Sequence, residues 1–266
     1  MKQVAVKTLQ SRKEGQYQQR STGYEERVPR RFLSEVSVWC GLNHKNILEF
    51  LGLAESSKHG LPLSMVSPWI VNGNVTEYIK LNPSTERLPL ILGVAEGVQF
   101  LHSNGIVHGD IKGPNILMSD NFEPLLCDFG MAKFCETYDY QNVSTTLRYA
   151  GSTRYMAIEL LWEGATKTSN GSDMWAFGMT CVEILTAQMP YPDCLDGPVI
   201  IKIHEEIFPG RPSECPDPLW SFMQRCWRKV VKDRPTSQDA VGMMSELLKA
   251  KHPPIRTYNV IDHPLA

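Results

Sequence analysis

The stretch from His108 to Met118, together with the triplet Asp128-Phe129-Gly130, constrains the fold more than any other part of this sequence. It places a carboxylate (Asp110), an ammonium (Lys112) and a carboxamide (Asn115) in one short turn, and the apolar run that follows is typical of a short strand. A second apolar run leads into Asp128 and another acidic turn. A fold that brings the two turns together supplies a proton acceptor, a cation and two oxygen ligands for Mg²⁺, which is the set that phosphoryl transfer needs.

The composition of the chain bounds its class. At 266 residues, with 42% hydrophobic and 21% charged residues, the chain is long enough for one large domain or two lobes around a substantial core. A formal net charge of -2 argues against a dedicated nucleic-acid-binding protein. No apolar run reaches membrane-spanning length, and the first residues contain no signal-peptide core. The seven cysteines are scattered without a Cys-x-x-Cys pair, which favours free thiols in a reducing compartment. We therefore expect a cytoplasmic protein with no membrane span and no nucleic-acid partner.

The predicted elements come in the order strands first, helices afterwards. Three strands are predicted over Val4–Lys7, Ile47–Leu53 and Leu61–Trp69, and an amphipathic helix that carries Glu35 is predicted over Val28–Leu42. Further helices are predicted over Asn74–Lys80, Glu86–His102 and Ser172–Ala187, and from a capping box at Thr236–Asp239 to about Ala250. This order predicts an α+β protein with a small sheet lobe and a larger, mainly helical lobe.

The two acidic turns resemble motifs of the eukaryotic protein kinase domain. The family's catalytic loop reads His-Arg-Asp-Leu-Lys-x-x-Asn, and His108–Asn115 departs from it at two positions. By this resemblance Asp110 accepts or orients the proton of the attacking hydroxyl, Lys112 steadies the γ-phosphate and Asn115 holds a metal ion. Asp128 of Asp-Phe-Gly is then the ligand of Mg²⁺ that bridges the phosphates of ATP.

Further motifs extend the resemblance from Val4 to about Leu248. Val4-Ala5-Val6-Lys7 is similar to the Val-Ala-Ile-Lys strand, so Lys7 is expected to hold the α- and β-phosphates and to pair with Glu35. In the later part of the chain, Gly151–Glu159 resembles the segment that ends in Ala-Pro-Glu. Asp173–Gly178 resembles the buried central helix, whose acid binds the backbone of the catalytic loop, and Asp233-Arg234-Pro235 supplies an arginine expected to pair with Glu159.

The same resemblance locates an adenine site. Ser67 is expected to be the gatekeeper at the back of the nucleotide pocket, and the backbone from Pro68 to Ile70 is expected to face the adenine edge. Ala5 is expected above the ring and Leu117 below it. The cofactors that the resemblance implies are ATP and Mg²⁺, and the partners are protein substrates.

The chain departs from the family pattern in three places. The family has a Gly-x-Gly-x-x-Gly hairpin before the lysine strand, but only six residues precede Lys7 and no Gly-x-Gly occurs in the sequence. We therefore expect a truncated small lobe without this loop, either because the sequence is a fragment or because the protein lacks the loop altogether. Gly109 replaces the arginine that commonly pairs with a phosphorylated residue, while Thr137, Ser144, Thr145 and Thr146 offer hydroxyls in the loop that follows. Ile158 replaces the proline of Ala-Pro-Glu.

The resemblance implies a bilobal protein-kinase-like fold, with residues 1–69 as a partial small lobe, 70–250 as the catalytic lobe and 251–266 as a tail. Lys112 just after the catalytic acid, rather than an Arg as in the tyrosine-kinase arrangement, favours Ser or Thr acceptors. Trp175 and Cys226-Trp227 suggest the tyrosine-kinase-like branch of serine/threonine kinases. A pseudokinase or scaffold is the alternative because the Gly-rich loop is missing. A small-molecule phosphotransferase is a third reading, which Ala157-Ile158-Glu159 and Asp173–Gly178 disfavour.

Overall fold

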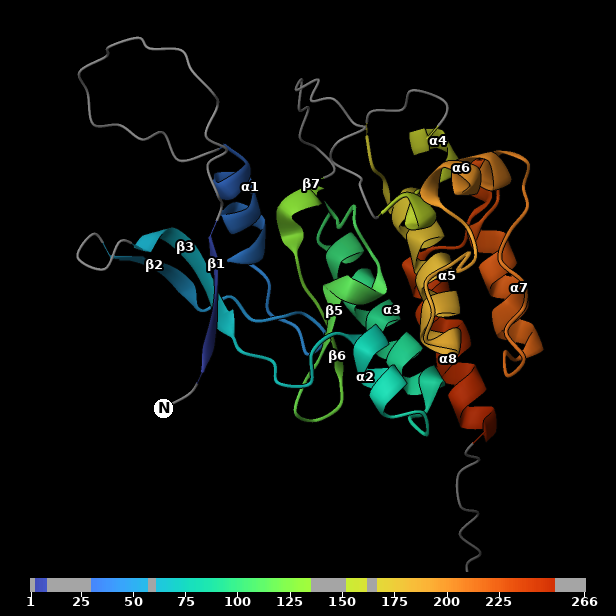
Figure 1. Cartoon of the computed structure of the whole chain (residues 1–266), viewed down its shortest axis with the longest axis horizontal. Helices are drawn as coiled ribbons and strands as arrows, with labels where there is room; N and C mark the ends of the chain where they lie inside the picture. The colour runs from blue at the N-terminus through green and yellow to red at the C-terminus, as the bar shows by residue number, and fades with distance from the viewer. Residues whose placement is uncertain (1–2, 9–29, 57–60, 135–151, 162–166, 252–266) are drawn as a thin grey trace, which may run out of the picture.

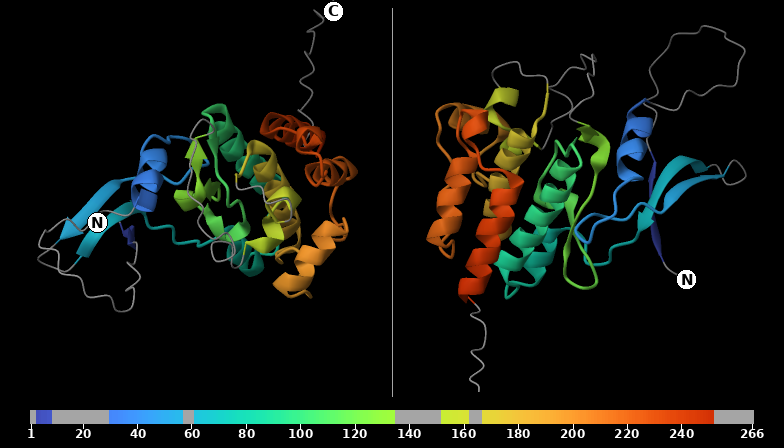
Figure 2. Two further views of the ribbon diagram at one scale, coloured as in Figure 1. Left: turned by 90° about the horizontal axis from the view of Figure 1, so that it is seen from above. Right: turned by 180° about the vertical axis from the view of Figure 1, so that it is seen from behind.

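The computed structural model describes residues 3–8, 30–56, 61–134, 152–161 and 167–251. The strands are β1 (Val4–Thr8), β2 (Gly52–Ser56), β3 (Leu61–Pro68), β4 (Ile106–Val107), β5 (Ile116–Met118), β6 (Pro124–Leu126) and β7 (Lys133–Phe134). The α-helices are α1 (Arg30–Trp39), α2 (Val75–Leu81), α3 (Arg87–Ser103), α4 (Ile158–Leu161), α5 (Asn170–Thr186), α6 (Asp196–His204), α7 (Asp217–Cys226) and α8 (Ser237–Lys251). In Figures 1 and 2 the three-stranded sheet and α1 lie at one end of the molecule, and the other helices form a larger body. The predicted α+β arrangement of a small sheet lobe and a larger helical lobe is confirmed.

The small lobe is built on an antiparallel sheet with the strand order β1-β3-β2. Because side chains alternate along a strand, the register that pairs Ala5 with Ser67 and Lys7 with Met65 puts these four residues on one face. This is the face that carries the expected nucleotide-binding residues of the strand. Val4 and Val6 lie on the other face and are about half exposed.

The predicted strand Ile47–Leu53 is wrong over most of its length, because the second strand of the sheet is β2, Gly52–Ser56. Ile47 and Leu48 are buried, but they join the larger lobe instead of the sheet. The Leu48 amide donates to the Leu126 carbonyl at 2.9 Å, and the Leu126 amide donates to the Asn46 carbonyl at 2.9 Å. The apolar character of this run therefore comes from anchoring a connection onto β6, which periodicity cannot distinguish from a buried strand.

Helix α1 packs its apolar side against the segment that begins with Phe129. Phe32, Val38 and Trp39 are buried, and the Trp39 ring centre lies 5.9 Å from that of Phe129. Glu35 is 1% exposed, so the helix carries a charged residue into the interior. A buried carboxylate requires a partner, and the partner is described with the site below.

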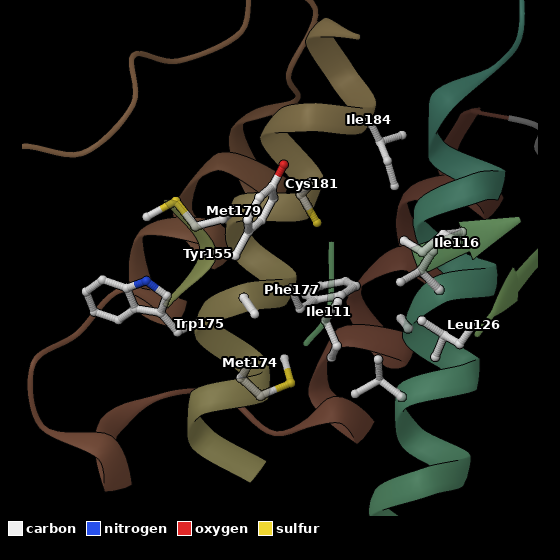
Figure 3. Packing of buried hydrophobic residues seen from close by; sticks show 14 of the residues in the cluster. Ile111, Ile116, Leu126, Tyr155, Met174, Trp175, Phe177, Met179, Cys181 and Ile184 are labelled. Atoms are coloured by element: carbon white, nitrogen blue, oxygen red, sulfur yellow. The ribbon is translucent and has the colours of Figure 1, made fainter. Parts of the chain in front are cut away.

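Helix α5 forms the centre of the larger lobe. Its residues are buried almost without interruption from Ser172 to Ile184, as expected for a helix that is apolar on all sides. Figure 3 shows Phe177 pointing toward Ile111 while Trp175 points to the opposite side of the helix. The predicted start of this helix at Ser172 is wrong, because Ser169 is the N-cap: Ser169 and Ser172 form a reciprocal capping box three residues apart.

Two other helix starts follow their sequence signals. The Asn74 side chain caps α2 by accepting the Glu77 amide at 3.0 Å, and Thr236 and Asp239 form the predicted capping box before α8. The described residues include no helix long and apolar enough to cross a membrane. The expected tail lies outside the described residues from 252 onward, as do the hydroxyls at Thr137, Ser144, Thr145 and Thr146.

Candidate active site

The first acidic turn holds its three polar side chains together. Lys112 Nζ lies 2.8 Å from Asp110 Oδ2, and the Asn115 side-chain amide donates to both Asp110 Oδ2 and the Asp110 carbonyl at 2.9 Å. Gly113–Asn115 form a short 3-10 turn directly before β5. The turn therefore fixes the carboxylate of Asp110 between an ammonium and an amide.

A buried aspartate on α5 holds the backbone before this turn. Asp173 is 1% exposed and accepts the amide of His108 at 2.8 Å and that of Gly109 at 2.9 Å. His102 Nε2, at the end of α3, lies 3.0 Å from the same carboxylate. The predicted contact between the acid of the central helix and the backbone of the catalytic loop is confirmed.

A second buried carboxylate, Glu183, was missed by sequence reasoning. It is 2% exposed and accepts hydrogen bonds from the Gly113 amide at 2.8 Å, the Thr76 hydroxyl at 2.7 Å and the Tyr155 hydroxyl at 2.7 Å. A β-carbon on Gly113 would lie 2.1 Å from Thr76 Oγ1 and 2.5 Å from the Glu183 carboxylate, so only glycine fits there. The available signal was one acid within the apolar run Cys181-Val182-Glu183-Ile184.

The second acidic turn follows β6. Asp128 has a left-handed backbone conformation (φ 63°), and its Oδ1 accepts the Gly130 amide at 3.4 Å. Phe129 is fully buried beside His108, with ring centres 5.4 Å apart, so it anchors the turn to the core. The amide of Cys127 donates to the carbonyl of Asn115 at 2.9 Å, and this bond joins the two acidic turns.

Lys7 connects the small lobe to this turn. Its Nζ lies 2.6 Å from Glu35 Oε1 on α1 and 2.6 Å from Asp128 Oδ1, so three segments far apart in the sequence meet at one ammonium. Burial acts to lower the pKa of Lys7, but Asp128 and Glu35 outweigh it and raise this pKa above its usual value. Burial likewise opposes ionisation of Asp128, yet Lys7 and the Gly130 amide bring the pKa of the carboxyl below its usual value. The predicted pair between Lys7 and Glu35 is confirmed.

The donor set around these turns fits a hard divalent cation and a polyphosphate. Asn115 uses its amide nitrogen on Asp110, which leaves its side-chain oxygen as the atom suited to a cation. Asp128 supplies an ionised carboxylate, and Lys7 supplies a positive charge beside it. Within the described residues no group of three or more His, Cys, Asp and Glu side chains forms a closed metal site. Mg²⁺ commonly takes one or two protein oxygens and completes its shell with phosphates and water, so two ligands are sufficient.

The expected adenine-binding residues lie around the connection between the lobes. Ala5 and Ser67 are cross-strand partners, and Ser67 is 6% exposed with its hydroxyl donating to the Pro68 carbonyl at 3.3 Å. Ile70 and Leu117 are partly buried against the core, and Leu117 forms an isolated backbone bridge with Asn74. Their role in binding adenine stays a prediction.

The segment between Ser152 and Glu159 closes the site on the side of the larger lobe. Lys112 Nζ donates to the Ser152 hydroxyl at 2.7 Å, so the ammonium beside Asp110 also reaches this segment. The guanidinium of Arg234 makes two bonds to Glu159, at 2.8 and 2.7 Å, and the Arg234 side chain is fully buried. This confirms the predicted pair between Arg234 and Glu159. Because Arg234 also donates to the carbonyl of Gly171 in α5, it holds the end of the segment next to that helix.

Comparison with known proteins agrees with this geometry. Residues 1–244 match the family described as protein tyrosine and serine/threonine kinase. The chain is 29% identical over 251 residues to Ephrin type-A receptor 5 of Rattus norvegicus, which covers 92% of this chain and 23% of the receptor. It is 28% identical to Ephrin type-A receptor 4-A of Xenopus laevis, covering 92% of this chain and 24% of the receptor. It is 31% identical over 229 residues to MAP3K epsilon protein kinase 1 of Arabidopsis thaliana, covering 84% of this chain and 15% of that protein. The chain spans less than a quarter of the length of these relatives.

Proposed function

Since the chain belongs to the protein tyrosine and serine/threonine kinase family, we propose that it transfers the γ-phosphoryl group of ATP, with Mg²⁺, to Ser or Thr hydroxyls of protein substrates. The observation that carries this proposal is the position of Lys7, within 2.6 Å of both Glu35 and Asp128. The need of the buried Glu35 for a partner explains the first of these contacts, but it does not explain why Asp128, a second carboxylate, lies at the same ammonium. Phosphoryl transfer does need a cation there, held in place beside a metal-binding carboxylate.

Each residue of the site then has a chemical task. Asp110 accepts or orients the proton of the acceptor hydroxyl, and Lys112 holds the Asp110 carboxylate in place while facing the transferred phosphate. Asn115 and Asp128 supply the oxygen ligands for Mg²⁺, which neutralises charge on the phosphates when bound. Lys7, held by Glu35, binds the α- and β-phosphates.

The choice of Ser or Thr as acceptor is supported by the two contacts of the Lys112 side chain. Its ammonium contacts Asp110 at 2.8 Å and Ser152 at 2.7 Å, so it spans the space between the catalytic acid and the segment that leads to Glu159. A short aliphatic hydroxyl can approach Asp110 beside such a bridge. A tyrosine places its hydroxyl several ångströms farther from the backbone than a serine does. Its ring would have to occupy the space between Asp110 and Ser152 that the Lys112 side chain already fills.

The nucleotide site is proposed along the connection between the lobes, with Ala5, Ser67, Ile70 and Leu117 around the adenine. We further propose lobe boundaries at residues 1–69 and 70–250, with 251–266 as a peripheral tail; the passage from β3 at Pro68 to α2 at Val75 supports the first boundary. A cytoplasmic location is proposed as well. The six cysteines in the described part of the chain are free thiols, as expected in a reducing compartment.

The test is an assay of the purified chain with Mg²⁺ and ATP. We expect transfer to Ser- and Thr-containing peptides above matched Tyr-containing peptides, and a rise in melting temperature with Mg²⁺ and ATP. Asp110→Asn should abolish transfer but keep this rise, whereas Lys7→Met should reduce both. Lys229→Met, at an exposed site in the larger lobe, is the control that should change neither. Transfer to tyrosine alone would refute the acceptor class, and nucleotide binding without transfer would favour a scaffold.

A further inference from the structure

A cavity of about 230 Å³ opens on the larger lobe, on the side of α6. It lies between the end of α5, the connection that leads to α6, α6 itself and the segment that follows it. We call it the α6 cavity. Its main lining residues are Val182, Met189, Tyr191, Lys202, Ile207 and Phe208.

The size of the α6 cavity indicates what it can hold. One water molecule needs roughly 10–15 Å³ of accessible cavity volume, so the cavity is much larger than a hydration site. Pockets for drug-sized ligands measure roughly 300–1,000 Å³, so it is smaller than a typical small-molecule site. Met189 is 50% exposed and Ile207 49% exposed, and both line the cavity, so an apolar group can reach it from solvent. One large apolar side chain of another protein fits these limits.

The charge of the α6 cavity is positive. Lys202 is the charged residue among those that line it, and within the described residues no carboxylate lies at ion-pair distance from its ammonium. Glu205 and Glu206 follow at the end of α6 but do not line the cavity. An occupant with a carboxylate next to its apolar group would therefore complement the cavity in both shape and charge.

The wall of the α6 cavity is joined to the active site by Arg154. This buried guanidinium donates to the carbonyls of Pro190, at 3.0 Å, and of Tyr191 and Cys194, and its Nε lies 3.1 Å from Asp196. Arg154 itself lies two residues after Ser152, which contacts Lys112, and directly before Tyr155, which contacts Glu183. Arg154 therefore holds together two parts of the protein: the connection from Pro190 to Cys194, which includes the cavity-lining Tyr191, and the segment from Ser152 to Tyr155 beside the active site.

From these observations we propose that the α6 cavity is a docking site for the protein substrates of this kinase. The substrate inserts one large apolar side chain between Met189 and Ile207, and an adjacent Asp or Glu pairs with Lys202. This proposal rests on the proposed function and narrows its substrate class, because it requires a recognition segment in the substrate that is separate from the phosphorylated residue.

Binding is tested by fluorescence anisotropy with two labelled peptides, Gly-Ser-Phe-Asp-Gly-Ser and Gly-Ser-Phe-Lys-Gly-Ser. We expect the Phe-Asp peptide to bind the wild-type chain about tenfold more tightly than the Phe-Lys peptide, and Lys202→Glu to reverse the preference. Lys229→Glu, which makes the same charge change at an exposed position away from the cavity, is the control and should leave the preference unchanged. Equal affinity of the two peptides for the wild-type chain would overturn the proposal, whether or not the Lys202→Glu variant folds.

A kinetic experiment tests the link to catalysis. A Ser-containing acceptor peptide is joined to the Phe-Asp or to the Phe-Lys segment by the same flexible Gly-Ser linker. We expect a lower KM for the Phe-Asp substrate with an unchanged kcat, and loss of this difference in Lys202→Glu. Anisotropy requires no turnover, so binding without phosphoryl transfer would refute the proposed function alone. Transfer with equal KM for both substrates would refute the docking site alone.

Discussion

Replacing Glu183, a buried carboxylate of α5, by alanine should destabilise the protein strongly. The carboxylate accepts three buried hydrogen bonds, from the Gly113 amide, the Thr76 hydroxyl and the Tyr155 hydroxyl. Burial and the nearby Glu183 charge raise the pKa of Tyr155, so its hydroxyl stays a donor throughout the physiological pH range. The variant Glu183→Ala therefore leaves three buried donors without their acceptor.

The expected loss can be worked from these bonds. Each buried donor without an acceptor costs about 1–3 kcal/mol. The two hydroxyls can rotate toward other acceptors or toward water in the space left behind, whereas the Gly113 amide is fixed by the backbone. We expect a loss of about 3–5 kcal/mol in the free energy of unfolding, which for a domain of this size lowers Tm by about 6–20 °C.

Glu183→Gln is the matched control for this experiment. Its side-chain oxygen can still accept the Gly113 amide and the Tyr155 hydroxyl, and its amide nitrogen can donate to the oxygen of Thr76. We expect it to cost about 1 kcal/mol, because neutral hydrogen bonds replace charge-assisted ones. Urea denaturation followed by far-UV circular dichroism measures both variants. The reasoning fails if Glu183→Ala lies within about 1 kcal/mol of wild type, or if the glutamine variant is as unstable as the alanine variant.

Three further predictions concern other buried or strained positions. Arg234→Met leaves the carboxylate of Glu159 without its partner and should cost about 3–5 kcal/mol, measured by urea denaturation; a loss below about 1 kcal/mol would contradict the pairing. Gly109→Ala should cost about 1–2 kcal/mol, because φ is +79° there and the new β-carbon would lie 3.0 Å from the Met131 carbonyl; an unchanged Tm would count against this strain. The lowered pKa of Asp128 means that its contribution to stability is present above its usual pKa and is lost as pH falls through the lowered value, whereas Lys7, whose pKa is raised, stays protonated across this range. Between about pH 6 and pH 2 the wild type should therefore lose more stability than Asp128→Asn in a series of thermal melts, and parallel curves would refute the ion pair.

Most of the candidate site could be predicted from short motifs, because the phosphoryl transfer that we propose needs particular residue types at fixed spacing within a turn. Asp110, Lys112 and Asn115 are close in sequence, so a single turn brings them together. Lys7 and Glu35 could be paired in advance because the family resemblance relates a strand to the helix that follows it. The start of β2 could not be predicted, because the signal came from a contact distant in sequence. Ile47 and Leu48 are apolar because they pack onto β6, and they do not lie in the three-stranded sheet.

The sequence by itself determined the chemistry of this protein: which groups can accept a proton, carry a positive charge or bind a hard cation, and on which turns and strands they lie. Only the tertiary structure decided that two further buried charges, Glu183 and Arg154, also hold the site in place. Glu183 and Arg154 look like ordinary residues of a helix and a loop, and their partners lie 28 to 107 and 36 to 42 positions away in the chain. The physical reason is that burying a charge is favourable only when the fold supplies several hydrogen bonds to it, and contacts between such distant segments leave no local pattern in the sequence.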